Sequence, residues 1–279
     1  MNLIEKFLNA LEATMKVPQS YGWFHILFII LTIATTVLFC VFFKDCNEKT
    51  FNRIVLICWI IFVILEVYKQ VILSFHIIDG EVKWYYEWWA FPFQLCSSPH
   101  YVLPFVFLLK NGKIRDAFIS YVMTFAFFGG LVVYIYPNDV FTDIIGINFQ
   151  TSIHHGLQIV LGIFFMVHNR KRVNFKFFLP STIVFSALTL IAMLLNIGVY
   201  KYLESSNQMQ TFNMFFISPY FNCTLPLLSL IYPNVPYIIF LFIYILGFAF
   251  VAYLMYLIQI GIYKLVGKIS HDRKQKVTN

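Results

Sequence analysis

The sequence contains little charge. Only 12% of its 279 residues are Asp, Glu, Lys or Arg, whereas 60% are hydrophobic. A soluble domain needs far more charge on its surface, so this composition excludes an ordinary water-soluble fold. No repeat or low-complexity tract stands out, and no small-residue cleavage site follows the first apolar stretch, which is too long for a signal-peptide core. We therefore expect that stretch to be a true membrane span.

Apolar runs of about 20 residues, the length of a membrane-crossing helix, fill most of the sequence. They predict an all-α, polytopic membrane protein, a single domain over residues 1–279. The loops between the runs are short except for Val199–Val235. The seven expected transmembrane helices cover residues 23–43, 51–73, 91–109, 114–136, 150–167, 176–198 and 236–264.

The positive charges are distributed unevenly between the two sets of loops. Five of the 20 Lys and Arg residues fall on one side of the expected membrane, and fifteen fall on the other. Cytoplasmic loops carry the excess of such residues, so we expect the N-terminus outside, the C-terminus in the cytoplasm, and a multi-pass location in the cell membrane. This belt accounts for the net charge of +7 without a nucleic-acid partner, and its basic tail suits anionic lipid. The fifteen residues are Lys44, Lys49, Arg53, Lys110, Lys113, Arg115, Arg170, Lys171, Arg172, Lys176, Lys264, Lys268, Arg273, Lys274 and Lys276.

The third expected span starts in the stretch WWAFPFQLCSSPHY, residues 88–101, which is polar for a segment that only crosses lipid. Cys96 lies about 7 Å below the outer surface, at a rise of about 1.5 Å per residue. His155, in the segment NFQTSIHHGLQ, lies at about the same depth in the fifth span. A thiol and an imidazole at matching depth can meet if the two spans are neighbours.

Glu66 is the only acidic residue well inside an expected span. Unpaired charge in lipid is costly, so we expect it to be buried and paired. Lys69 and Gln70 follow at i+3 and i+4 and can share its helix face. Arg53 and a histidine are further candidate partners, and Glu66 could orient a catalytic imidazole.

The choice of imidazole is open. His154 and His155 point about 100° apart on a helix, so only one can face the same partner as Cys96. Gly156 permits close helix approach, which favours His155 and leaves His154 as the alternative. His100 lies at i+4 from Cys96 and shares its face.

Two alternatives compete with a catalytic thiol. Cys96, His100 and the His154–His155 pair could bind zinc, although the sequence lacks Cys-x-x-Cys or His-Glu-x-x-His spacing. We expect no metal and no other cofactor. A Cys96–Cys223 disulfide is the second alternative in an oxidising compartment, but we expect Cys96 to be free. With five cysteines in the chain, at least one stays unpaired.

The long outer loop is too apolar to lie free in solvent. Its core reads QTFNMFFISPYFNCTLPLLSLIYPNVP, residues 210–236. Proline-broken apolar segments of this kind lie in the interface or dip into protein, so we expect a lid over an outer cavity. Around that cavity we expect Gln94, Ser97, Asn213 and His100 to bind the substrate.

Several motifs, in span order, resemble the YwaF-like integral membrane protein family, whose animal relatives include transmembrane protein 164. The motifs are RIVLICWIIFVILEVYKQ, FPFQLCSSP, IHHG and FNMFFISP. The resemblance implies a cysteine-dependent phospholipid acyltransferase whose Cys and His are essential. By motif, these are Cys96 and His155, or alternatively His154. One departure is Gln94, where bacterial members often carry histidine.

The leading hypothesis is therefore acyl transfer between membrane phospholipids and lysophospholipids, or acyl hydrolysis, with Cys96 as nucleophile and histidine as base. One alternative is a non-catalytic seven-helix transporter or receptor. A retinal protein is disfavoured because no lysine lies between Pro236 and Tyr263. The other alternative is a Cys/His zinc-binding membrane hydrolase. The sequence does not define the oligomeric state.

Overall fold

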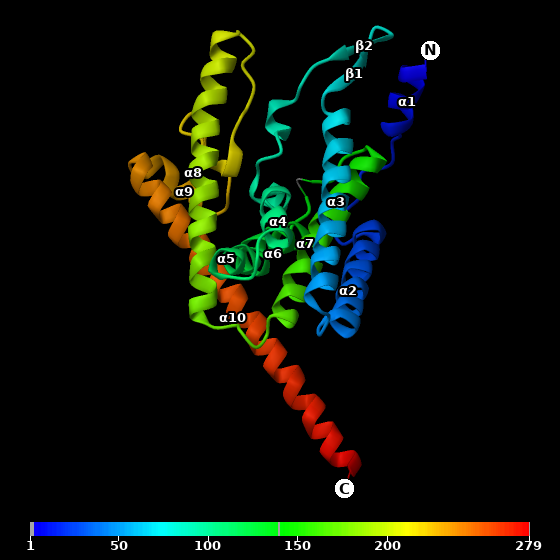
Figure 1. Cartoon of the computed structure of the whole chain (residues 1–279). Helices are drawn as coiled ribbons and strands as arrows, with labels where there is room; N and C mark the ends of the chain where they lie inside the picture. Colours follow the sequence, from blue (N-terminus) through cyan, green and yellow to red (C-terminus); the bar gives the residue numbers. More distant parts are fainter. Residues whose placement is uncertain (1–2, 139, 279) are drawn as a thin grey trace.

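The computed structural model describes residues 3–138 and 140–278, with side chains as far as Leu265. The fold is mostly helical, and among the described residues six helical segments are long and apolar enough to cross a membrane. Figure 1 shows them as a bundle from which the last helix extends. The segments are α2 (Trp23–Phe43), α3 (Glu48–Ile72), the run from α5 (Lys113–Tyr121) to α6 (Phe127–Ile135), α7 (Ile145–His168), α8 (Phe175–Ser205) and residues Tyr237–Leu265 of α10 (Tyr237–Thr278).

Two of these helices, α3 and α8, begin at side-chain caps. The side chain of Asn47 accepts a hydrogen bond from the backbone N–H of Thr50 at the start of α3. Asn174 does the same for Phe177 at the start of α8. Each cap satisfies a backbone donor that the first helical turn leaves without a partner, so both helices begin within a few residues of the predicted spans.

The third expected span, 91–109, is not a full helix. Its regular part is α4 (Pro99–Leu108), ten residues long, and the segment before it contains only the short turn η2 (Leu95–Ser97). Pro92 and Pro99 lack the backbone N–H that a continuous helix needs, and Pro99 instead starts α4. The expected count of seven long spanning helices is therefore not confirmed; six are found, and this segment is a shorter apolar helix.

The fourth expected span is helical but irregular. Between α5 and α6, residues Val122–Ala126 form a fully buried π-helical turn, η3. It packs against α7 and η2, so the wider turn lies inside the bundle beside the segment that carries Cys96. Such turns are uncommon and occur frequently at functional sites.

Helix α7 is the centre of the bundle. It packs against α2, α6, η3, α3 and α10, and it is the most buried of the six candidate spans. Its polar segment Gln150–His155 is almost entirely buried, whereas α2 and α10 expose most of their apolar surface. The polar residues of the fifth expected span therefore face protein, and the apolar faces of the outer helices are available to lipid.

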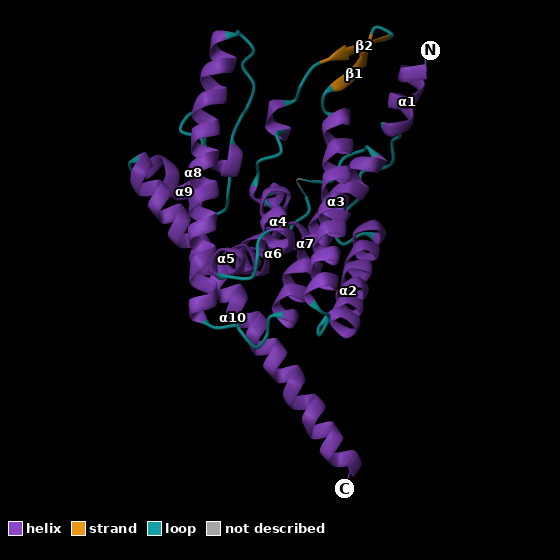
Figure 2. Cartoon of the chain, in the orientation of Figure 1, coloured by secondary structure: helices purple, strands orange, loops and turns teal. Residues whose placement is uncertain are grey.

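Two elements were not predicted from the sequence. A short helix, α1 (Leu3–Leu11), begins the described chain, and an antiparallel hairpin joins β1 (Phe75–Ile78) to β2 (Glu81–Trp84). Figure 2 shows the hairpin beyond the end of α3. Its turn is Asp79–Gly80, and both residues have positive φ, as two-residue hairpin turns require. The structure is thus mostly helical, as predicted, with one small hairpin in addition.

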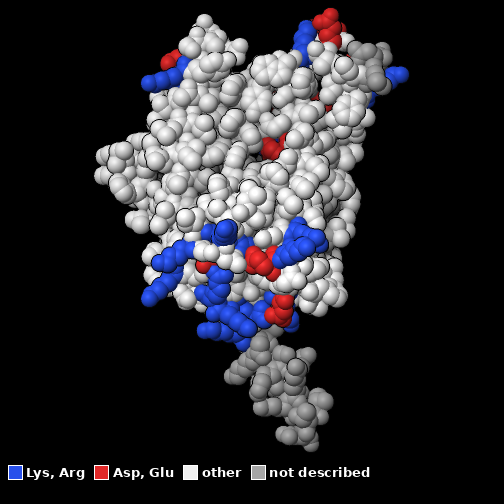
Figure 3. All heavy atoms as spheres, viewed as in Figure 1, with Lys and Arg blue, Asp and Glu red and all other residues white. Residues whose placement is uncertain are grey.

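Ion pairs join three of the expected cytoplasmic loops at one end of the bundle. Arg170, after α7, lies 2.5 Å from Asp45, after α2. Arg172 pairs with Asp116 of α5, and Arg115 lies 2.5 Å from Glu48 of α3. Figure 3 shows a belt of Lys and Arg at this end, close to where α10 leaves the bundle. The side chains of Lys268, Arg273, Lys274 and Lys276 lie outside the described residues.

Candidate active site

The residue at the centre of the candidate site is Cys96, in the turn η2. Two donors bind its backbone carbonyl: Nε2 of His154 at 2.8 Å and the side-chain amide of Gln158 at 2.6 Å. Both donors belong to α7, one helical turn apart, and therefore share a face. The structure thus brings the expected third and fifth spans together at Cys96, with His154 in direct contact with its backbone.

Glycines of α6 allow this close approach. A Cβ atom added at Gly130 would lie 2.6 Å from the carbonyl oxygen of His155 and 2.8 Å from Cβ of Gln158. At Gly129 the added atom would lie 3.8 Å from Cα of Cys96. Helix α6 therefore packs against α7 and the Cys96 turn at a distance that only small residues permit.

His155, the preferred base in the sequence analysis, occupies a different environment. Its Nδ1 atom donates to the backbone carbonyl of Thr151 at 2.7 Å, while Nε2 is buried and has no hydrogen-bond partner among the described residues. That hydrogen bond leaves a lone pair on Nε2, the form in which an imidazole accepts a proton. The structure gives His155 no hydrogen bond to Cys96.

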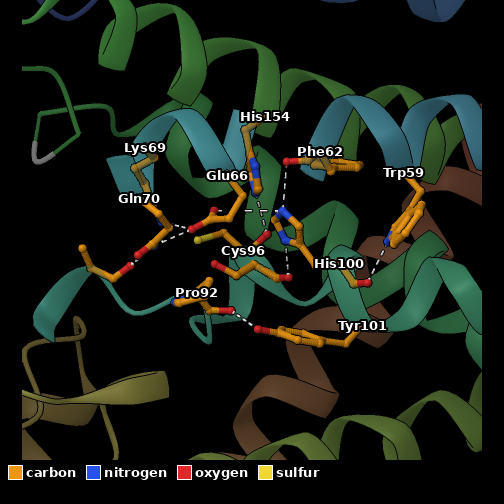
Figure 4. Close-up of polar contacts among 12 residues, drawn as sticks. Trp59, Phe62, Glu66, Lys69, Gln70, Pro92, Cys96, His100, Tyr101 and His154 are labelled. Atoms are coloured by element: carbon orange, nitrogen blue, oxygen red, sulfur yellow. Dashed lines mark hydrogen bonds and ion pairs between the residues drawn. The ribbon is translucent and has the colours of Figure 1, made fainter. Parts of the chain in front are cut away.

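Glu66 is buried and paired, as expected. Its Oε1 atom lies 2.8 Å from the ammonium group of Lys69 and accepts a hydrogen bond from Gln70 at 2.7 Å. Its Oε2 atom lies 4.0 Å from Nε2 of His100. Lys69 and Gln70 are the i+3 and i+4 partners that helix spacing predicted. Figure 4 shows the sulfur of Cys96 pointing toward this carboxylate.

Tyr86 extends the network around Glu66. Tyr86 donates a hydrogen bond at 2.9 Å to the amide oxygen of Gln70. Burial, together with the charge of Glu66, raises the pKa of Tyr86 to about 12. The phenol therefore remains protonated and keeps donating at neutral pH.

His100 connects the Cys96 turn to α3. Its Nδ1 atom lies 2.8 Å from the carbonyl oxygen of Ser97, and its Nε2 atom lies 3.0 Å from the carbonyl oxygen of Phe62. His100 and His154 lie with their ring centroids 5.4 Å apart. The expected substrate-binding residues His100 and Ser97 thus belong to the same cluster as Cys96, and Ser97 is buried.

An apolar cavity also reaches Cys96. Its volume is about 540 Å³, within the range of small-molecule binding sites. Gln94, Leu95 and Cys96 form one part of its wall. The remainder is contributed by α6, α10 and the loop after α8, through residues that include Phe128, Val132, Phe215, Leu225, Tyr244 and Phe248.

A second, open pocket of about 320 Å³ lies beside Glu66. Gln70, Ser74 and His100 supply its other polar residues, and four apolar side chains complete the wall. Cys96 therefore lines an apolar cavity while its sulfur points toward a carboxylate that lines a more polar pocket (Figure 4).

Gln94 and Asn213 fix the loop that covers the apolar cavity. The side-chain amide of Gln94 donates to the carbonyl of Asn213 at 3.0 Å and accepts from the N–H of Phe215 at 2.9 Å. The Asn213 side chain binds backbone groups of Asn222 and Ser218. The loop is buried here and covers the cavity as a lid. The polar groups of Gln94 and Asn213 are used to hold this loop in place.

The structure also shows the state of the cysteines, and it adds one site residue that the sequence did not predict. All five cysteines are free, including Cys96 and Cys223, which were candidates for a disulfide. Gln158 was not singled out, although it follows His154 at i+4 and so had to share its face. That spacing, on a helix rich in polar residues, was the available signal.

The fold and the site define a multi-pass helical membrane protein with a free thiol, three histidines and an ion pair gathered inside the bundle. The chain belongs to the TMEM164 family, whose model matches residues 20–259. No curated protein and no solved structure matches the chain. Family membership agrees with the relation to transmembrane protein 164 that the sequence motifs indicated.

Proposed function

We propose that this protein is a membrane-embedded acyltransferase or acyl hydrolase that acts on phospholipids through Cys96. The observation that carries the proposal is the position of Cys96 on the wall of the apolar cavity, with its sulfur toward the polar group around Glu66 (Figure 4). A phospholipid has the same division, with apolar chains joined to a polar headgroup by esters. Cys96 thus lies at the boundary where a scissile ester would be found.

The reaction would proceed in two steps. The Cys96 thiolate attacks the ester carbonyl, the bond to the glycerol oxygen breaks, and a protonated imidazole returns its proton to that oxygen. A thioester and a lysophospholipid result. The hydroxyl of another lysophospholipid then attacks the thioester, gives its proton to the imidazole, and releases the thiolate. Water in place of that hydroxyl gives hydrolysis, and neither route requires a cofactor.

We assign proton transfer to His155. Because Nδ1 donates to Thr151, Nε2 carries the lone pair of the neutral ring. Nε2 is buried and has no hydrogen-bond partner among the described residues. His154 uses its Nε2 to hold the Cys96 carbonyl, which suits a role in positioning the turn. A change of side-chain rotamer or the entry of a water would be needed to link His155 to the thiol, since catalytic hydrogen bonds often form only when substrate is bound.

The proposed orientation places the belt of Lys and Arg in the cytoplasm and the lid outside. It is supported by the ion pairs that gather three basic loops at one end of the bundle. Cys96 then lies in the outer half of the membrane. An impermeant reagent applied to intact cells should therefore fail to label a tag at the C-terminus; labelling of that tag would reverse the assignment.

The activity test uses purified full-length protein in liposomes that contain one phospholipid with a labelled acyl chain and an unlabelled lysophospholipid. Wild-type protein should move label to the lysophospholipid or release it as fatty acid. Cys96→Ala should abolish both products. Cys58→Ala, which changes a buried cysteine of α3 away from the cavity, is the matched control and should remain active. Full lipid turnover by Cys96→Ala would refute the proposal.

A further inference from the structure

We propose that Glu66, His100 and His154 bind a transition-metal dication, with Zn²⁺ the best match to the ligands, and that this ion holds the turn carrying Cys96. One ligand atom from each of the three side chains lies within 4.8 Å of the other two. The residues come from three separate elements, α3, α4 and α7. Bonds from Zn²⁺ to such ligands are about 2.0–2.2 Å, so each group would move inward by less than about 1 Å.

His154 is already in the form that binds a metal. Its Nε2 hydrogen donates to the carbonyl oxygen of Cys96 at 2.8 Å, which leaves the lone pair on Nδ1. That Nδ1 atom is buried and has no hydrogen-bond partner among the described residues. Metal-binding histidines commonly donate their other N–H to a carbonyl, which fixes the ring in this way.

The two carboxylate oxygens of Glu66 have different surroundings. Lys69 and Gln70 both bind Oε1, whereas Oε2 is buried without a hydrogen bond and faces His100. A buried carboxylate oxygen without a partner is costly. A cation between Oε2 and the imidazoles would supply the missing partner, while Lys69 retains the other oxygen.

His100 provides the second imidazole. Nδ1 lies 2.8 Å from the carbonyl oxygen of Ser97, and in the neutral tautomer that donates from Nδ1 the lone pair is on Nε2. That atom lies 3.0 Å from the carbonyl oxygen of Phe62 and 4.0 Å from Oε2 of Glu66. A neutral Nε2 and a carbonyl oxygen repel at this distance. A metal ion beside them removes the repulsion; the other neutral tautomer, in which Nε2 carries the hydrogen and donates to Phe62, is the competing explanation, which the experiment below distinguishes.

The ligand set indicates the class of metal. Two imidazoles and one carboxylate suit Zn²⁺ and other first-row dications, whereas Mg²⁺ and Ca²⁺ prefer sites made of oxygen. Two histidines and a glutamate are also the three ligands of several zinc sites that keep a fourth position open.

The structure suggests what the ion does. The two imidazoles donate their remaining N–H groups to the carbonyls of Cys96 and Ser97, which are consecutive residues of η2. An ion that fixes both rings therefore fixes the turn that carries the thiol. These three side chains act as positioning residues, and the inference stands on their geometry whether or not the thiol is catalytic.

The experiment measures metal directly. Full-length protein carrying an affinity tag without histidines is incubated with ZnCl₂ in detergent, desalted, and analysed for zinc by mass spectrometry. We expect about one zinc per wild-type chain. His154→Gln and His100→Gln should each lower zinc affinity at least tenfold. His155→Gln is the matched control. The ring of His155 lies next to His154 in the sequence but binds Thr151, so this variant should retain the metal.

Two readouts keep the test independent of folding and activity. Zn²⁺ should raise the unfolding temperature of the wild-type protein, and a chelator should reverse the shift. Cobalt-loaded wild-type protein should show the visible absorption of a bound ion, which His154→Gln lacks. Cys96→Ala should still bind zinc, so the metal site and the proposed acyl transfer can fail separately. Folded wild-type protein without zinc, or zinc that persists in both His100→Gln and His154→Gln, would overturn the inference and favour the tautomer of His100 that donates from Nε2 to Phe62.

Discussion

Nε2 of His154 lies 2.8 Å from the carbonyl oxygen of Cys96. The adjacent His155 instead donates from Nδ1 to the carbonyl of Thr151 in its own helix. Two neighbouring histidines therefore have different tasks: one fixes the turn that carries the thiol, and the other keeps a free lone pair inside the bundle. This division leads to different expectations for their substitution.

We expect His155→Gln to trap an acyl group on Cys96. In the proposed mechanism the substitution slows both steps, but it slows the second more, because a lysophospholipid hydroxyl is far less acidic than a thiol and is a much weaker nucleophile without a base. The variant supplied with phospholipid should gain the mass of one acyl chain, removable by hydroxylamine. His155→Gln combined with Cys96→Ser is the control and should form no thioester. An unmodified Cys96 in an otherwise active His155→Gln protein would contradict the assignment of the base.

Gln94→Leu should loosen the lid next to Cys96. The substitution removes the bonds to the carbonyl of Asn213 and the N–H of Phe215. Buried backbone groups left without partners cost about 1–3 kcal/mol, so exchange of the Phe215 amide should become at least about tenfold faster. Hydrogen exchange followed by mass spectrometry measures this change.

The matched control is Gln210→Leu. Gln210 also uses both ends of its amide, on Trp88 and Tyr86, but it lies outside the cavity wall. It should loosen its own contacts and leave exchange at Phe215 unchanged. Equal exchange at Phe215 in both variants and the wild-type protein would show that Gln94 does not hold the lid.

The sequence predicted those parts of the fold that depend on length and hydropathy. The span 23–43 coincides with α2, and the partners of Glu66 follow from the spacing of a helix. The third span could not be predicted in the same way. Its total hydropathy suits a helix, whereas Pro92 and Pro99 and the tertiary hydrogen bonds to α7 hold residues 91–98 in an irregular conformation.

Most members of the candidate site, apart from Gln158, could be named from the sequence, but their contacts could not. Depth along a helix brought Cys96 level with His154 and His155, yet the rotation of α7 that decides which ring meets the turn depends on packing. The glycines of α6 are part of that packing, because Gly130 lets α6 lie directly on the backbone of His155. Single-sequence periodicity contains no information on such contacts between helices.

Glu66→Gln should lower the thermal stability of the protein. Lys69 would lose its charged partner at 2.8 Å while its side chain stays only 19% exposed, and an unpaired buried charge is costly. We expect a loss of roughly 1–3 kcal/mol, measured as a lower unfolding temperature in detergent. Glu66→Gln with Lys69→Met should recover part of the loss because neither charge remains. If the double variant lost more stability than the sum of the losses in Glu66→Gln and Lys69→Met alone, the result would argue against a stabilising ion pair.

If the protein transfers acyl groups as proposed, Gly247→Leu should shift its preference toward shorter acyl chains. Gly247 lies on α10 in the wall of the apolar cavity, and a Cβ added there meets no atom within 4 Å. The larger side chain can therefore enter the cavity without straining the fold, and it would occupy space that the end of a long chain needs. Competition between labelled long-chain and short-chain phospholipids measures the preference. Gly198→Leu is the matched control, since Gly198 also has open space around it but is absent from the cavity wall, and it should leave the preference unchanged. An equal long-chain to short-chain ratio in Gly247→Leu and wild-type protein would mean that the acyl chain binds elsewhere.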